Sequence, residues 1–101
     1  MAKLYFDSGK ADLQPQSVTL IEGVIAAAKA KPSAKLSISG FHDSTGNLEQ
    51  NQELAKQRAM KVRDALKAGG IAEERIELRK PEQVQGTGND AEARRVEVKL
   101  M

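Results

Sequence analysis

Alternation of hydrophobic and polar residues marks the strands that this chain is expected to form. The alternation is cleanest at Arg95–Leu100, near the C-terminus, and it also occurs at Leu36–Gly40 and over residues 76–79. Side chains that face the same way every second residue are typical of a strand with one covered face. Residues 3–6 are predicted to form a further short strand, followed by a polar loop over residues 7–14.

After this loop, the hydrophobic residues take the spacing of a helix. Pro15 stands where a first helical turn tolerates proline, and Pro32 follows the end of the pattern. Gly23 lies inside this helix at a cost of about 1 kcal/mol relative to alanine, so we expect a close packing contact there. The stripe expected to face the core consists of Leu20, Ile21, Val24, Ile25 and Ala28.

A second helix is predicted between the second and third strands. Asn47 followed by Gln50 is typical of a capping box at its start, and the Gly69-Gly70 pair is expected to end it. Its core stripe is predicted to consist of Leu48, Ala55, Ala59, Val62 and Leu66.

The predicted order of elements is strand, helix, strand, helix, strand, strand (βαβαββ). Two helices of this length can cover one face of a four-stranded sheet. We therefore predict an α+β fold, a two-layer sandwich with a four-stranded mixed sheet and two main helices on one face. With 101 residues, the chain can bury one core but not two, so residues 1–101 are predicted to form a single domain.

The composition argues against a nucleic-acid partner. The net charge is only +2, and the charged residues are interspersed, without a basic block that could track phosphates. The aromatic residues are Tyr5, Phe6 and Phe41, and no predicted strand carries an aromatic pair with flanking basic residues. We predict no nucleic-acid binding.

Catalytic and metal-binding motifs are also missing. Cysteine is absent, and His42 is the only histidine, whereas a zinc site needs several converging ligands. Ser44, His42 and Asp43 are adjacent in the chain and cannot easily align as nucleophile, base and orienting acid. There is no glycine-rich phosphate cradle. We expect neither an enzyme nor a cofactor or metal.

The strongest candidate for a binding site is the pair Asp43 and Arg58. Asp43 comes just after a predicted strand, and Arg58 follows fifteen residues later on the second predicted helix. On a helical wheel, Arg58 lies in one sector with Asn51 and Leu54, beside the apolar stripe. An acid and a fixed cation suit a ligand that carries both an ammonium and a carboxylate group. The alternative is a simple ion pair that ties the loop to the helix.

This pattern resembles the OmpA-like peptidoglycan-binding domain, and the resemblance covers nearly the whole chain. It rests on Phe6-Asp7, on Gly40 with Asp43 through Gly46, on Asn51, Leu54, Arg58 and Ala59, on Gly70-Ile71 with Arg75-Ile76, and on Arg94-Arg95-Val96-Glu97. The resemblance implies non-covalent binding of peptidoglycan through diaminopimelate of the stem peptide.

The resemblance also implies a role for each site residue. Asp43 and Arg58 would contact diaminopimelate, Asn51 and Leu54 would support the pocket, and Asp7 would lie at its rim. Arg94 or Arg95 would brace the site from the last strand, and the choice between them stays open. His42 stands where the family often has threonine, and its protonation would compete with the ligand ammonium for Asp43.

Two departures from the family pattern support a rival interpretation. The glycine-aromatic-glycine segment usual after the third strand is replaced by Leu78-Arg79-Lys80-Pro81, and asparagine is missing before Arg94. Both changes affect the loop that flanks the pocket. The rival is an OmpA-like domain that no longer binds the wall and acts as an interaction or assembly module.

The resemblance implies a periplasmic domain of an outer-membrane or cell-envelope protein. Met1-Ala2-Lys3 leads into a strand-like segment without the apolar stretch of an export signal. We therefore expect a domain excised from a longer envelope protein, with membrane contact only through a missing N-terminal part. The oligomeric state stays open, and a homodimer is one option.

Overall fold

The computed structural model describes residues 2–7, 10–41, 48–79 and 94–101, without the side chain of Leu48. The helices are α1 (Pro15–Ala30), α2 (Leu48–Ala68) and the short 3-10 helix η1 (Glu73–Arg75). The strands are β1 (Ala2–Tyr5), β2 (Leu36–Gly40), β3 (Ile76–Leu78) and β4 (Arg95–Leu100). The cap predicted at Asn47 lies outside the described residues.

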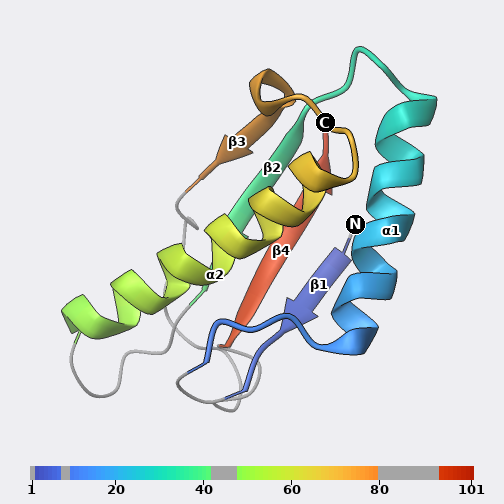
Figure 1. Ribbon diagram of the computed structural model, residues 1–101. Helices are drawn as coiled ribbons and strands as arrows, with labels where there is room; N and C mark the ends of the chain where they lie inside the picture. The colour runs from blue at the N-terminus through green and yellow to red at the C-terminus, as the bar shows by residue number, and fades with distance from the viewer. Residues whose placement is uncertain (1, 8–9, 42–47, 80–93) are drawn as a thin grey trace.

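The four strands form one mixed sheet in the order β1-β4-β2-β3. The central strand β4 runs antiparallel to β1 and to β2, and β3 runs parallel to β2. Both α1 and α2 lie on the same face of this sheet (Figure 1). The predicted α+β sandwich with a four-stranded mixed sheet and two main helices on one face is thus confirmed.

The core lies between this sheet face and the two helices. The sheet contributes alternate side chains, among them Leu36 and Ile38 from β2 and Val96 and Val98 from β4. The helices contribute Ile21, Val24, Ala28, Ala55, Ala59, Val62 and Leu66. The predicted core stripes are confirmed at these positions. Leu20 is 44% exposed instead, because about 100° of helical turn separates it from Ile21.

Two glycines, Gly23 and Gly40, differ in how closely their surroundings are packed. A β-carbon built at Gly23 meets no atom within 4 Å, so the prediction of a close packing contact there is wrong. At Gly40, by contrast, a β-carbon would collide with the carbonyl oxygen of Ala55 on α2. The end of β2 therefore packs directly against the α2 backbone, and only glycine allows this approach.

Element boundaries differ from the predictions by one residue. The first strand ends at Tyr5 rather than at Phe6, although the Phe6 N–H still donates to the Arg94 carbonyl at 3.0 Å. The third strand ends at Leu78, and the Arg79 N–H donates to the Ile38 carbonyl at 2.8 Å. Helix α2 ends where predicted, with Gly70 at a φ of +100°.

The helix η1, which the sequence pattern did not reveal, places Arg75 at the C-terminus of α1. The Arg75 Nη2 atom donates to the carbonyls of Ala28 and Lys31, both at 2.8 Å, and Nε donates to the Ala34 carbonyl at 2.9 Å. A guanidinium at a helix C-terminus satisfies carbonyls that lack helical partners and complements the helix dipole. Arg75 thus joins the start of β3 to the end of α1.

Candidate functional site

Arg58 projects from α2 onto the loop that follows β1. Its Nε atom donates to the Lys10 carbonyl at 2.8 Å, and its Nη2 atom donates to the Asp7 carbonyl at 3.0 Å. Its Cζ atom lies 5.2 Å from the centre of the Phe6 ring. Only 2% of the residue is exposed, so Arg58 is buried more deeply than its place beside the apolar stripe predicts.

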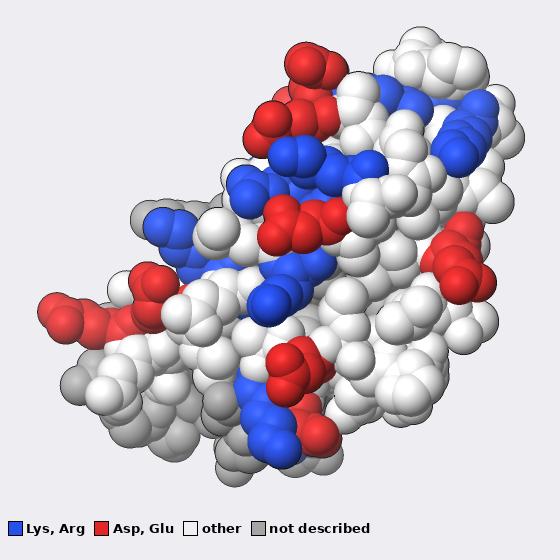
Figure 2. All heavy atoms as spheres, viewed as in Figure 1, with Lys and Arg blue, Asp and Glu red and all other residues white. Residues whose placement is uncertain are grey.

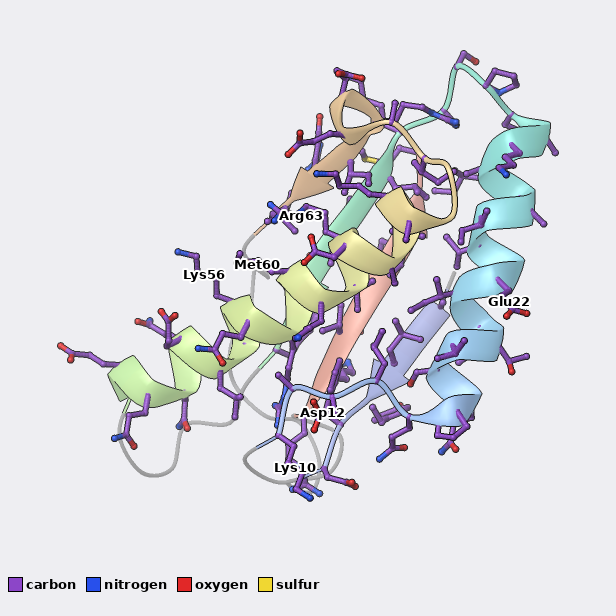
Figure 3. The ribbon with its side chains drawn as sticks, viewed as in Figure 1. Lys10, Asp12, Glu22, Lys56, Met60 and Arg63 are labelled. Atoms are coloured by element: carbon purple, nitrogen blue, oxygen red, sulfur yellow. The ribbon has the colours of Figure 1, made fainter. Side chains whose placement is uncertain are left out.

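The loop itself is folded so that its carbonyls converge on Arg58. The Lys10 N–H donates to the Asp7 carbonyl at 3.1 Å, which makes this carbonyl a double acceptor. The Asp7 carboxylate accepts a hydrogen bond from Gln14 Nε2 at 2.9 Å. Figure 3 labels Lys10 and Asp12 on this loop and shows Lys56 projecting from the other side of α2. Asp7 is therefore next to Arg58 and contacts it through its main chain. Its role at the rim of a pocket stays a prediction.

A second arginine joins the same group of carbonyls. Arg94, which precedes β4, donates from Nε to the Phe6 carbonyl at 3.2 Å. Burial lowers the pKa of Arg58, and the positive charge of Arg94 lowers this pKa further. Among the residues that the structure describes, no carboxylate forms an ion pair with either arginine. Within this part of the chain, two cations are held by main-chain oxygens, an arrangement suited to an incoming anion.

Arg95 lies on the opposite face of the sheet. Its Nε atom donates to Glu97 Oε2 at 2.7 Å, and its Cζ atom lies 3.9 Å from the centre of the Phe41 ring. Successive side chains of a strand point to opposite faces, which explains why the two neighbouring arginines separate. Of the two candidates, Arg94 is the one that the fold brings next to Arg58.

The remaining predicted site residues divide into two groups. Asn51 and Leu54 precede Arg58 on α2 and are both half-buried, so all three share one helix. Asp43 and His42 lie outside the described residues. Both the clamp formed by Asp43 with Arg58 and the alternative of a simple ion pair therefore remain predictions.

The sequence pattern did not predict the groups that hold Arg58 in place, which are the Asp7 and Lys10 carbonyls and the Phe6 ring. Phe6 was assigned only to the opening strand, and the loop over residues 7–14 was treated as a plain polar connection. Main-chain carbonyls have no residue signature, so no pattern could identify the carbonyls of Asp7 and Lys10 as acceptors. The one available signal was a phenylalanine immediately before a polar loop, where its ring can pack beneath a cation.

The surface around the helices carries both signs of charge. Figure 2 shows acidic side chains interspersed with basic ones over α2, and a largely uncharged surface over α1. The described residues contain no helix long and apolar enough to cross a membrane. They also contain no group of three or more histidine, cysteine or acidic residues suited to a metal ion.

Two relatives are similar to most of this chain but are much longer. The probable lipoprotein YiaD of Escherichia coli (strain K12) is 37% identical over 71 residues, which cover 70% of this chain and 32% of YiaD. The peptidoglycan-binding protein ArfA of Mycobacterium tuberculosis (strain ATCC 25618 / H37Rv) is also 37% identical over 71 residues, covering 70% of this chain and 22% of ArfA. The chain thus spans a third or less of the length of these relatives.

Solved structures share the fold over the whole chain. The peptidoglycan-associated lipoprotein from Burkholderia pseudomallei superposes with a TM-score of 0.88 at 26% identity and covers 100% of this chain and 91% of that one. The C-terminal domain of Helicobacter pylori MotB superposes with a TM-score of 0.80 at 18% identity and covers 100% of this chain and 84% of that one. A family model matches residues 5–98. By fold and by sequence, this chain belongs to the OmpA family.

Proposed function

We propose that this domain binds peptidoglycan non-covalently through the diaminopimelate of the stem peptide. The observation that carries this proposal is the pair Arg58 and Arg94, two neighbouring cations held by main-chain carbonyls and without an ion-pair partner among the described residues. Removing two positive charges from water is unfavourable unless negative charge or oriented dipoles compensate them. A ligand carboxylate would supply the missing negative charge.

The hydrogen bonds of Arg58 define how such a carboxylate would approach. Its two described bonds leave from Nε and Nη2, which form one edge of the guanidinium group. The group carries five N–H donors, so the end that contains Nη1 is left for the ligand. In this proposal, Asp43 accepts hydrogen bonds from the ligand ammonium while Arg58 holds the carboxylate. His42 then lies at the rim, and Asn51 and Leu54 support the pocket.

Two proteins that are similar to this chain have names that refer to peptidoglycan, which supports the proposal. ArfA is a peptidoglycan-binding protein, and the lipoprotein from Burkholderia pseudomallei is peptidoglycan-associated. YiaD is a probable lipoprotein. We infer that the domain acts in the periplasm and anchors a longer outer-membrane or envelope protein to the wall. In this role it is a binding domain rather than an enzyme.

The rival function is an assembly module that has lost wall binding. The observation that favours it is the segment 78–81, which replaces the family's usual glycine-aromatic-glycine sequence beside the pocket. Partners would then be proteins, including a second copy of this chain. Both functions use the same fold, so only a binding measurement separates them.

Co-sedimentation with purified peptidoglycan sacculi tests the proposal. The wild-type domain should pellet with sacculi, and Asp43→Ala should remain in the supernatant because the ligand ammonium loses its acceptor. The matched control is Asp64→Ala on α2, whose carboxylate is exposed and 3.4 Å from Arg63 Nη2. This control should pellet like the wild type. A folded wild-type domain that stays in the supernatant would favour the assembly module.

A further inference from the structure

All aromatic residues of this chain lie at one end of the sheet. The sequence contains one tyrosine and two phenylalanines, Tyr5, Phe6 and Phe41, and no tryptophan. They occupy the end of β1 and the residues immediately after β1 and β2, where Arg94 and Arg95 also lie (Figure 1, lower end of the sheet). Phe6 packs under Arg58 on the helix side. Tyr5 and Phe41 lie on the other side of the sheet.

These two aromatic residues form a row with Arg95 on the outer face of the sheet. Tyr5 is the direct cross-strand partner of Arg95, and the Phe41 N–H donates to the Arg95 carbonyl at 2.8 Å. The Arg95 guanidinium stacks over the Phe41 ring at 3.9 Å. The row spans two strand spacings, about 10 Å. Tyr5, at one end of the row, is 37% exposed.

The charge on this row differs from that on the other face. Arg95 forms an ion pair with Glu97 at 2.7 Å, and the side chains of this pair are only 16% and 17% exposed. Arg58 and Arg94, in contrast, have no ion-pair partner among the described residues. The outer row thus combines aromatic surface with a polar pair of opposite charges, which suits an amphipathic group.

We propose that the Tyr5–Arg95–Phe41 row is a subsite for the glycan part of the same wall fragment. A pyranose ring presents a face of C–H groups that can pack on an aromatic ring and a rim of hydroxyls that can bond to Arg95 and Glu97. This inference rests on the proposed function, because the sugar is joined to the stem peptide. Tyr5 adjoins Phe6, and Arg95 adjoins Arg94, so the row and the two arginines share one end of the sheet, around which a single ligand would extend.

Calorimetric titration with two matched ligands tests this subsite. One is the free diaminopimelate-containing tripeptide, and the other is the same tripeptide joined to the N-acetylglucosamine–N-acetylmuramic acid disaccharide. The wild-type domain should bind the disaccharide form roughly fivefold more tightly, which corresponds to about 1 kcal/mol. Tyr5→Ala should remove this difference and leave the affinity for the free tripeptide unchanged, whereas Tyr5→Trp should retain it.

The matched control is Lys99→Ala, which changes an exposed residue on the same face at the other end of β4. It should bind both ligands like the wild type. Equal wild-type affinity for the two ligands would overturn the glycan subsite and leave the proposed function intact. An equal loss for both ligands in Tyr5→Ala would also overturn it. If the wild type bound neither ligand, the proposed function itself would fail.

Discussion

Arg58 combines a structural role with the proposed binding role. Its Nε and Nη2 atoms hold two carbonyls of the loop after β1, and its guanidinium group lies near the Phe6 ring. A buried cation without such acceptors would be strongly destabilising. The same contacts fix the orientation of the remaining N–H groups, which in the proposed function would meet the ligand. Loss of binding on mutation of Arg58 would therefore not distinguish a lost contact from a lost loop.

The structural role predicts a large change in stability. Arg58→Ala should lower the free energy of unfolding by about 2–4 kcal/mol, because two charge-assisted hydrogen bonds are lost and two carbonyls lose a donor. Arg58→Lys should recover only part of this loss, since one ammonium cannot reproduce the planar fork. Urea unfolding followed by circular dichroism measures both. An Arg58→Ala midpoint equal to that of the wild type would contradict this account of the loop.

The sequence identified Arg58 as a candidate but not the groups that surround it. The helical wheel placed Arg58 beside the apolar stripe of α2, in one sector with Asn51 and Leu54. The carbonyls that it binds could not be predicted, since backbone groups look alike in every sequence. Alternation along β4 separates Arg94 from Arg95, but the face that each takes follows only once β4 is placed in the sheet.

Helix α1 contains a glycine, which has a low helix propensity, at a position where no close packing requires it. Gly23 lies in its middle, on an exposed position, and a β-carbon there would have no neighbour within 4 Å. Gly40 is the opposite case, because the Ala55 carbonyl oxygen of α2 occupies the space that a β-carbon would need. The two glycines look equivalent in the sequence, and only the packing of the elements separates them.

Gly23→Ala should therefore stabilise the domain by about 0.5–1 kcal/mol, through the higher helix propensity of alanine. Thermal and urea unfolding of the variant would measure this gain, and peptidoglycan binding should be unchanged. A destabilised Gly23→Ala variant would mean that the exposed face of α1 packs against something in solution.

In the part of the chain that the structure describes, hydrophobic periodicity predicted the strands β2, β3 and β4 and both main helices, because it reports directly which side of an element is covered. The short helix η1 was not predicted, because three residues are too few to show a hydrophobic period. The strand order β1-β4-β2-β3 could not be predicted from the sequence either. It depends on pairing between segments far apart in the chain, for which a single sequence holds no local signal.

The topology of the whole molecule brings the candidate residues to one end of the sheet. The ends of β1 and β2 and the start of β4 meet there, and the loop after β1 folds under α2 (Figure 1). The helix side of this end holds the two arginines, and the outer side holds the aromatic row. We expect modest affinity from one such domain, so stable anchoring would need many copies or a tether to the wall.

The central claim is that Arg58, with Asp43, binds the diaminopimelate of the stem peptide. The most direct test is a titration of the domain with a diaminopimelate-containing stem peptide, followed by the amide chemical shifts in NMR spectra. Shifts should concentrate at residues 40–51, around Arg58 and in the loop over residues 7–10, and Asp43→Ala should abolish all of them in a domain that stays folded. Unchanged wild-type spectra at millimolar ligand would contradict the claim and direct the search toward protein partners.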